Sequence, residues 1–359
     1  MSQLILHVVG ARPNFMKAAP VIRALEALDA AQFVVHTGQH YDRAMSDVFF
    51  VQLGLPEPDV NLGVGSGTHA QQTAALMTGM EAQLLERRPA LVVVYGDVNS
   101  TLAAALVASK LQIPVAHVEA GLRSFDLSMP EEINRRVTDN LSSLLFVTSP
   151  EGMAYLAREG VDPTAMHLVG NPMIDTLLEN LERFDPGRVR ADLGIGPRYA
   201  VSTLHRPANV DDPATARAIV AALSDVGASL PVVIPLHPRG RESLRRAGLD
   251  GADGVRVVDP LGYVEFLSLV RGASLVLTDS GGIQEETTIL DGPCLTIRPN
   301  TERPITITHG TNQLVAPGEV GKQAAAILDG TTRFPTERPP LWDGRAGARI
   351  ADVIQGLYG

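Results

Sequence analysis

Acidic side chains follow two apolar runs of the chain at the points where each run ends. Residues 91–95 (LVVVY) form an apolar, β-branched run typical of an interior parallel strand, and Asp97 comes shortly after it. Residues 113–118 form a second such run, which Glu119 follows directly. Ligands of open α/β sheets bind at the carboxyl ends of strands, so both carboxylates could carry acid–base chemistry. The plainer alternative is that Asp97 caps a helix and Glu119 pairs with Arg123.

Charged side chains also lie at the start of the helix that we predict from residue 130. Glu131 and Glu132 fall in its first turn, and Arg135 follows in the next. Carboxylates and arginines therefore recur at several positions where the chemistry of an α/β protein is expected.

The segment from Gly10 to Lys17 joins the first predicted strand to the first predicted helix. It lacks the G-x-G-x-x-G dinucleotide fingerprint, so the usual sequence argument for NAD is absent. It carries two cations, Arg12 and Lys17, near a helix N-terminus, where an anion is favoured and a cation is not. The pattern favours an anion-binding role over a merely solvated first turn.

Residues 278–286 (TDSGGIQEE) resemble this arrangement in the second half of the chain. Ser280, Gly281 and Gly282 allow close backbone approach at a helix N-terminus, which suits a diphosphate. Glu286 could accept both hydroxyls of a ribose. The alternative for the glutamates is compensation of the helix dipole, which fits Glu285 better than Glu286.

Two histidines each follow a predicted strand of the second half, and each has an arginine close by. These are His205, followed by Arg206, and His237, followed two residues later by Arg239. A lone histidine is more often structural, whereas two at equivalent strand ends are candidates for function. Arg303, after the last predicted strand, adds a cation near the expected phosphates.

The composition is that of an ordinary globular protein. The chain has 359 residues and a formal net charge of −10, which argues against general nucleic-acid binding. Its single cysteine, Cys294, excludes an intramolecular disulfide and lies in a run that predicts a buried strand rather than a catalytic thiol. We expect no membrane span and no signal peptide, and therefore a cytoplasmic protein.

Apolar strand-like runs alternate with helix-like segments along nearly the whole chain, which predicts an α/β fold with parallel sheets and right-handed crossovers. The predicted strands are 4–9, 33–37, 91–95, 115–118, 144–148, 199–203, 232–235, 255–258, 275–278 and 294–297. Predicted helices include 16–28, 68–87, 102–111, 214–226, 264–272 and 282–290. Length and pattern predict two domains, residues 1–170 plus 343–359 and residues 171–342, with a cleft between them and a last helix that crosses back to the first domain.

The motifs occur together in the order of one family. They are residues 10–13 (GARP), 95–97 (YGD), 117–123 (HVEAGLR), 129–135 (MPEEINR), 279–286 (DSGGIQEE) and 301–304 (TERP). With them, the chain resembles the non-hydrolysing UDP-N-acetylglucosamine 2-epimerases over essentially its whole length. The resemblance implies the glycosyltransferase-B architecture of two Rossmann-like domains, with UDP held mainly by the second. It also implies a homodimer, no NAD or other cofactor, and no metal.

In that family UDP is eliminated to give 2-acetamidoglucal and then re-added, since no carbonyl acidifies the C2 proton for a direct exchange. By resemblance Asp97, Glu119 and Glu131 supply acid–base carboxylates and His205 is an essential histidine near the glycosidic oxygen or phosphate. The positions matched to substrate contacts are Arg12, Lys17, Arg135, His237, Phe266, Ser280, Gly281, Gly282, Glu286 and Arg303. Positioned carboxylates would transfer protons, and the cations would stabilise the departing diphosphate.

Some positions depart from the best-known members. Pro207 and Ala208 replace an arginine and a glutamate, Ile305 replaces a glutamate, and Gln71 replaces an arginine that contacts an activating substrate molecule. The segment from Glu119 to Glu131 is two residues shorter than in those members. These changes leave open another UDP-hexose substrate, such as UDP-glucose or a diacetamido sugar. A hydrolysing relative, a glycosyltransferase of the same fold and a nucleotide-sugar sensor are the remaining alternatives.

Overall fold

The computed structural model describes residues 3–38, 53–236, 238–335 and 337–359 and divides the chain into two compact units. Unit 1 comprises Met1–Glu179 and Pro340–Gly359, and unit 2 comprises Asn180–Pro339. The boundary predicted after residue 170 falls before helix α7 (Pro172–Glu179), whereas the contacts place this helix in unit 1. The reason is tertiary, because α7 packs against α1 and the C-terminal helix α16.

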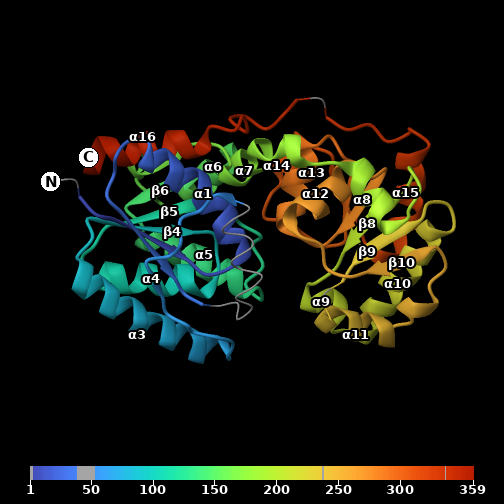
Figure 1. The fold of residues 1–359 in the computed structure, drawn as a ribbon, viewed down its shortest axis with the longest axis horizontal. Helices are drawn as coiled ribbons and strands as arrows, with labels where there is room; N and C mark the ends of the chain where they lie inside the picture. Colours follow the sequence, from blue (N-terminus) through green and yellow to red (C-terminus); the bar gives the residue numbers. More distant parts are fainter. Residues whose placement is uncertain (1–2, 39–52, 237, 336) are drawn as a thin grey trace. The chain divides into compact units, whose positions relative to one another are not determined.

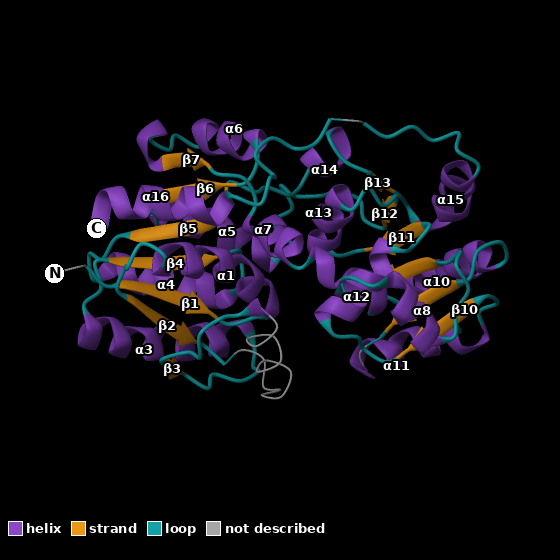
Figure 2. Cartoon of the chain, turned by 45° about the horizontal axis from the view of Figure 1, so that its top comes forward, coloured by secondary structure: helices purple, strands orange, loops and turns teal. Residues whose placement is uncertain are grey.

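Unit 1 is built on a parallel sheet with the strand order β3-β2-β1-β4-β5-β6-β7. Figure 1 labels its strands β4, β5 and β6, and Figure 2 labels every strand of this sheet. Its strands are β1 (Ile5–Val9), β2 (Gln32–His36), β3 (Val60–Asn61), β4 (Leu91–Tyr95), β5 (Val115–Ala120), β6 (Leu144–Val147) and β7 (Met166–Leu168). Strands β1, β4 and β5 are buried along their whole length, as is typical of parallel strands covered on both faces.

Two groups of helices pack in unit 1. Helices α3 (His69–Arg87), α4 (Asn99–Lys110) and α5 (Pro130–Leu141) contact one another in a row, and α1 (Arg12–Glu26), α7 and α16 (Ala346–Tyr358) contact one another. The short α6 (Pro150–Arg158) and the 3₁₀ turn Pro163–Ala165 join β6 to β7. Gly347 of α16 lies so close to Pro20 of α1 that a Cβ would meet its carbonyl oxygen at 2.6 Å. The predicted return of the C-terminal helix to the first domain is confirmed.

Unit 2 has a second parallel sheet, in the order β10-β9-β8-β11-β12-β13. Its strands are β8 (Ala200–Thr203), β9 (Val232–Pro235), β10 (Val255–Val258), β11 (Leu275–Thr278), β12 (Cys294–Thr296) and β13 (Asn312–Leu314). Its α-helices are α8 (Pro186–Leu193), α9 (Pro207–Val210), α10 (Pro213–Gly227), α11 (Pro238–Arg246), α12 (Tyr263–Arg271), α13 (Gly281–Ile289), α14 (Ile305–Thr308) and α15 (Val320–Leu328), with 3₁₀ turns at Leu181–Arg183, Leu249–Gly251 and Pro317–Glu319. Figure 2 shows parallel strands flanked by helices in each unit, so the predicted α/β class is confirmed.

Each sheet has a point where the strand order reverses, and such points form ligand crevices at the carboxyl ends of the strands. In unit 1 this point lies between β1 and β4, followed by Gly10 and Asp97. In unit 2 it lies between β8 and β11, followed by His205 and Ser280. The predicted site residues therefore begin at the switch point of each sheet.

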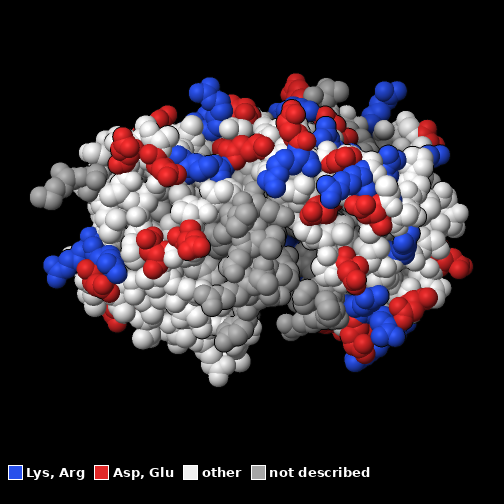
Figure 3. Space-filling model, in the orientation of Figure 1, with Lys and Arg blue, Asp and Glu red and all other residues white. Residues whose placement is uncertain are grey.

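No helix among the described residues combines the length and apolar character needed to cross a bilayer. On the face of the molecule in Figure 3, acidic and basic side chains are intermingled rather than gathered in patches of one sign.

Candidate active site

The turn after β1 is held by one buried amide side chain. Asn14 accepts hydrogen bonds from the backbone N–H groups of Gly10 and Ala11, at 3.2 and 3.0 Å. Its Nδ2 donates to the carbonyl oxygen of Tyr95 at 2.7 Å. The end of β4 and the start of α1 are thereby fixed to each other. Arg12 is the first residue of this helix.

Glu119 has an unusual backbone conformation at the end of β5. Its φ is 74°, in the left-handed region that a residue with a side chain rarely adopts. The register between β5 and β6 shifts between Val118 and Ala120, so Glu119 is the extra residue of a bulge. Bulges and such backbone strain are common beside active sites, where they redirect a side chain.

The Glu119 carboxylate forms an ion pair with Lys17 of α1, and both side chains are buried. The alternative that Glu119 pairs with Arg123 is wrong, because Arg123 instead binds Asp139 and Glu159. The cation that the sequence placed near a helix N-terminus thus has an anion of the protein itself as its partner. Gly96 lies against the pair, since a Cβ there would meet Lys17 Nζ at 2.9 Å and Glu119 Oε2 at 3.2 Å. A residue with a side chain at position 96 would push into the two charged groups.

Asp97 is held by Arg135 of α5. The guanidinium donates to Oδ2 of Asp97, and its other terminal nitrogen donates to Glu132 Oε2 at 2.5 Å. Arg135 is buried, whereas the side chain of Asp97 keeps 22% of its exposure. The alternative that Asp97 caps a helix is not supported, because Val98 occupies the N-cap of α4. Asp97 and Arg135, both predicted site residues, are therefore brought together at a partly exposed position.

The two glutamates at the start of α5 differ in environment. Glu131, predicted as an acid–base group, is exposed and has no hydrogen bond or ion pair to another described residue. Glu132 is fully buried and accepts from the backbone N–H groups of Ser124 and Phe125, at 2.8 and 3.2 Å, as well as from Arg135. Sequence reasoning missed Glu132, although its position three residues before Arg135 on a helix signals an ion pair.

In unit 2, His205 is held against Asp279 at the switch point. Asp279 Oδ1 lies 2.8 Å from His205 Nδ1, and Asp279 also accepts from the backbone N–H of Arg206 at 3.0 Å. Asn209 Nδ2 adds a donor at 3.1 Å. Burial acts to raise the pKa of Asp279, but the hydrogen bonds from His205, Arg206 and Asn209 outweigh it and lower the pKa. Asp279 belongs to the motif at residues 279–286, and it orients the histidine, whose side chain is 63% exposed.

The Ser-Gly-Gly turn after β11 is packed tightly against Arg303. A Cβ at Gly281 would meet Arg303 Nη1 at 2.5 Å, so a side chain there would have to displace the guanidinium. Arg303 forms ion pairs with Glu285 at 2.8 Å and with Glu302 at 2.6 Å. Ser280 is the N-cap of α13, but its hydroxyl makes no capping hydrogen bond. Helix amides at Gly281 and Gly282 and a neighbouring guanidinium are thus collected at one helix N-terminus, an arrangement that suits an anion.

Glu286 lies buried one turn into α13. Burial, together with the charge of Glu285, raises its pKa to about 8. Glu285 is the glutamate that pairs with Arg303, so the two neighbours have different roles. A buried carboxyl with a raised pKa accepts hydroxyl donors readily once it ionises, which fits the predicted ribose contact.

The remaining predicted residues are placed as follows. Phe266 lies in α12 and is half-buried. His237 lies outside the described residues.

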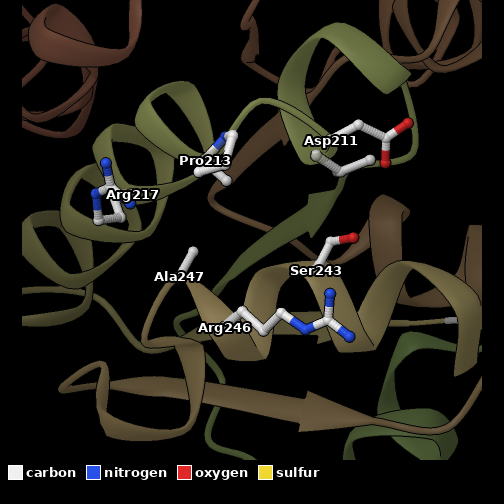
Figure 4. A pocket seen from close by; sticks show the side chains of 8 residues that line it. Asp211, Pro213, Arg217, Ser243, Arg246 and Ala247 are labelled. Carbon is white, nitrogen blue, oxygen red and sulfur yellow. The ribbon is translucent and has the colours of Figure 1, made fainter.

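A cavity of about 110 Å³ in unit 2 is lined by α9, α10 and α11, including Asp211, Arg217 and Arg246 (Figure 4). It is smaller than the roughly 300–1,000 Å³ of ligand pockets and contains none of the predicted residues.

Chemically, unit 1 offers two carboxylates, Asp97 and Glu119, each held by a buried cation, and unit 2 offers an anion site beside an oriented histidine. The first set can move protons and the second can bind a phosphate group. Among residues 3–38, 53–236, 238–335 and 337–359, no group of three or more His, Cys, Asp or Glu side chains is arranged to hold a metal ion.

Comparison with known proteins gives matches over nearly the whole chain. The family model described as UDP-N-acetylglucosamine 2-epimerase matches residues 23–355. The UDP-N-acetylglucosamine 2-epimerase of Methanocaldococcus jannaschii is 41% identical over 357 residues, which cover 97% of each chain. The UDP-2,3-diacetamido-2,3-dideoxy-D-glucuronate 2-epimerase of Pseudomonas aeruginosa is 42% identical over 360 residues, covering 98% of this chain and 99% of the relative.

One solved structure that resembles this chain is that of the M. jannaschii enzyme in complex with UDP-GlcNAc and UDP. Its TM-score is 0.90 at 41% identity, with 98% of this chain and 99% of that chain covered.

Proposed function

The chain belongs to the UDP-N-acetylglucosamine 2-epimerase family, and we propose that it interconverts UDP-N-acetylglucosamine and UDP-N-acetylmannosamine by eliminating and re-adding UDP. The observation that carries this proposal is the pair of carboxylates at the ends of β4 and β5. Asp97 follows β4 and Glu119 lies near the end of the neighbouring β5, and a buried cation holds each of them. An enzyme that removes and returns a proton at one carbon needs such a positioned pair.

In the proposed reaction the C2–H bond of the sugar breaks as a carboxylate of unit 1 accepts the proton. The electron pair forms the C1–C2 double bond, and the C1–O bond breaks with both electrons leaving on UDP. The return step delivers a proton to the opposite face of C2 while UDP attacks C1. Asp97, Glu119 and Glu131 are the proposed acid–base groups, and the resemblance assigns none of them to a particular face.

Unit 2 is proposed to bind the UDP part of the same molecule. The amides at Ser280, Gly281 and Gly282 and the Arg303 guanidinium would hold the diphosphate, and Glu286 would accept the ribose hydroxyls. His205, oriented by Asp279, would donate to the leaving phosphate oxygen. Phe266 is proposed to contact the uracil, and His237 the nucleotide. Arg12, Lys17 and Arg135 would contribute positive charge on the sugar side.

A second candidate substrate is a UDP-sugar that carries two acetamido groups. The observation that favours it is the 42% identity to the P. aeruginosa diacetamido-glucuronate epimerase, which is close to the 41% identity to the M. jannaschii UDP-N-acetylglucosamine enzyme. The chemistry at C1 and C2 would be the same, and only the recognition of C3 and C6 would differ.

The purified protein should be incubated separately with UDP-N-acetylglucosamine, UDP-glucose and a UDP-diacetamido sugar, with products followed by proton NMR. We expect a new anomeric signal for the 2-epimer, with the nucleotide still attached, from UDP-N-acetylglucosamine. Conversion of the diacetamido sugar alone would replace the substrate while keeping the reaction. Free hexosamine plus UDP would indicate the hydrolysing relative, and no conversion of any substrate would contradict the proposal.

We also propose that the chain forms a homodimer, as the resemblance implies, and that it is cytoplasmic, as its sequence predicts. Light scattering on the purified chain tests the first, with a mass of twice 38.2 kDa expected.

A further inference from the structure

Helix α5 presents a third charged side chain to the core of unit 1, in addition to Arg135, which binds Asp97, and Glu132, which binds Arg135. Glu132, Arg135 and Asp139 are spaced three and four residues apart, so they share one face of the helix. Asp139 is buried, as are the two side chains it binds, His117 and Arg123. Neither the proposed mechanism nor the family motifs assign a role to Asp139.

The Asp139 carboxylate forms hydrogen bonds to the chain on both sides of Glu119. Its Oδ1 accepts from His117 Nδ1 at 2.6 Å, and its Oδ2 accepts from the backbone N–H of Gly121 at 3.2 Å. One contact therefore lies two residues before the bulged Glu119 and the other two residues after it. A bulged residue with a positive φ is strained, and it keeps this conformation only when surrounding contacts hold the backbone in place. The two hydrogen bonds of Asp139 provide such contacts.

His117 connects Asp139 to the residue after β4 through a second hydrogen bond. Its Nε2 donates to the carbonyl oxygen of Gly96 at 2.8 Å, and Gly96 is the residue that lies against Lys17 and Glu119. The two ring nitrogens of His117 thus join Asp139 Oδ1 to the carbonyl oxygen of Gly96. A series of hydrogen bonds, Asp139–His117–Gly96, thus connects α5 through β5 to the backbone just before Asp97.

Arg123 links Asp139 to a second carboxylate. Its Nη1 donates to Asp139 Oδ2 at 2.7 Å, and its Nη2 donates to Glu159 at 2.5 Å. Arg136 also lies near Glu159, with its Nε 4.0 Å from Oε1. Glu159 lies on the outer side of the cluster and keeps 23% of its exposure.

We propose that Asp139 is a positioning residue for proton transfer, holding the Glu119 bulge and, through His117, the Gly96–Asp97 turn in their reactive geometry. This inference rests on the proposed function, because it assumes that Glu119 or Asp97 exchanges the C2 proton. Asp139 itself does not reach the sugar. Small displacements of a reacting group slow the chemical step strongly. Loss of the hydrogen bonds from Asp139 should therefore lower kcat by roughly ten- to hundredfold.

The test compares wild type with Asp139→Asn, His117→Gln, His117→Asn and Glu159→Gln. The amide nitrogen of Gln occupies the place of Nε2 and that of Asn the place of Nδ1. His117→Gln therefore keeps the contact to Gly96 and loses Asp139, whereas His117→Asn keeps Asp139 and loses Gly96. Glu159→Gln is the matched control, since it alters the same charge cluster without touching the bulge.

Three quantities are measured in both directions: kcat per mole of folded protein, KM, and the isotope effect on kcat with substrate deuterated at C2. For Asp139→Asn and His117→Gln we expect kcat to fall at least about tenfold, KM to stay within about threefold, and the isotope effect to equal or exceed that of wild type. His117→Asn should lose less kcat than His117→Gln, and Glu159→Gln should stay within about twofold of wild type.

An isotope effect that collapses toward one would show that another step had become slow, and it would overturn the proposal. Equal losses in the two His117 variants, or an Asp139→Asn enzyme as fast as wild type, would overturn it as well. If Asp139→Asn does not fold, the two His117 variants decide. Absence of 2-epimerase activity in wild type is a separate outcome, which would reject the proposed function itself.

Discussion

Lys17 and Glu119 form an ion pair across unit 1, with only 5% and 1% of their side chains exposed. Lys17 comes from the first helix and Glu119 from the bulge at the end of β5, so the pair joins two elements far apart in sequence. The pair places a charged ammonium group directly beside one of the proposed proton-transfer carboxylates. Because both groups are buried, each depends on the other for its charge to be tolerated.

Removing one partner of this pair should destabilise unit 1. Lys17→Met leaves Glu119 as an uncompensated buried charge, which typically costs about 3–5 kcal/mol. The double variant Lys17→Met/Glu119→Gln removes both charges and should recover part of that loss, although it should be inactive. Urea unfolding of both single variants and the double variant gives the coupling energy. Additive single-variant losses would mean that the two groups do not interact as the structure has them.

The two neighbouring glutamates of α5 should behave differently when neutralised. Glu131→Gln changes an exposed side chain, so the unfolding midpoint should stay near that of wild type while kcat falls, if Glu131 is an acid–base group. Glu132→Gln removes the buried charge that holds Arg135 and the Ser124–Phe125 turn, so it should lower the midpoint clearly. Thermal unfolding and initial rates separate the two effects. Full activity in Glu131→Gln would remove Glu131 from the proposed mechanism.

Gly281 should be essential for binding the nucleotide. In Gly281→Ala the new methyl group meets Arg303, whose guanidinium is fixed by Glu302 and Glu285 and cannot easily move away. UDP affinity should fall at least about tenfold, a loss of roughly 1.4 kcal/mol. Gly292→Ala is the control, because a Cβ at Gly292 meets no atom within 4 Å. Equal affinities of the two variants in titration calorimetry would place the diphosphate elsewhere.

UDP affinity should rise with pH through the titration of Glu286. Its pKa is raised to about 8, so the carboxyl is mostly protonated in the free protein at pH 7. Ribose hydroxyls donate to the ionised form, so binding should release a proton below pH 8, and affinity should increase by at most about tenfold per pH unit until it levels off above pH 8. Calorimetry from pH 7 to 9 in buffers of different ionisation enthalpy measures both effects. Glu286→Gln should bind more weakly and lose this slope, and an unchanged slope would assign it to another group.

The strands were predictable because their sequences leave little choice. The runs 91–95, 232–235 and 275–278 coincide with the largely buried, mostly apolar strands β4, β9 and β11. The run 255–258 coincides with β10, an edge strand with an exposed arginine at its second position. The edge strands β3, β7 and β13 were missed. They have only two or three residues each, too few to show a periodic pattern.

The contents of the site were predictable, but its internal pairing was not. Motifs indicated Asp97, Glu119, His205 and Ser280 because each follows a strand end. No local sequence rule indicates the positive φ of Glu119, beside which Asp139 of α5 accepts from the backbone N–H of Gly121. The partner of Glu119 likewise turned out to be Lys17 rather than the nearby Arg123, because tertiary packing decides which buried charges meet.

The most direct test of proton exchange at C2 is to run the epimerisation in deuterium oxide and to examine C2 of the product by NMR. Elimination and re-addition of UDP require the C2–H bond to break and a solvent-derived proton to return through the carboxylates. We therefore predict deuterium at C2 of the epimer. A product that retains its original hydrogen at C2 would contradict the mechanism.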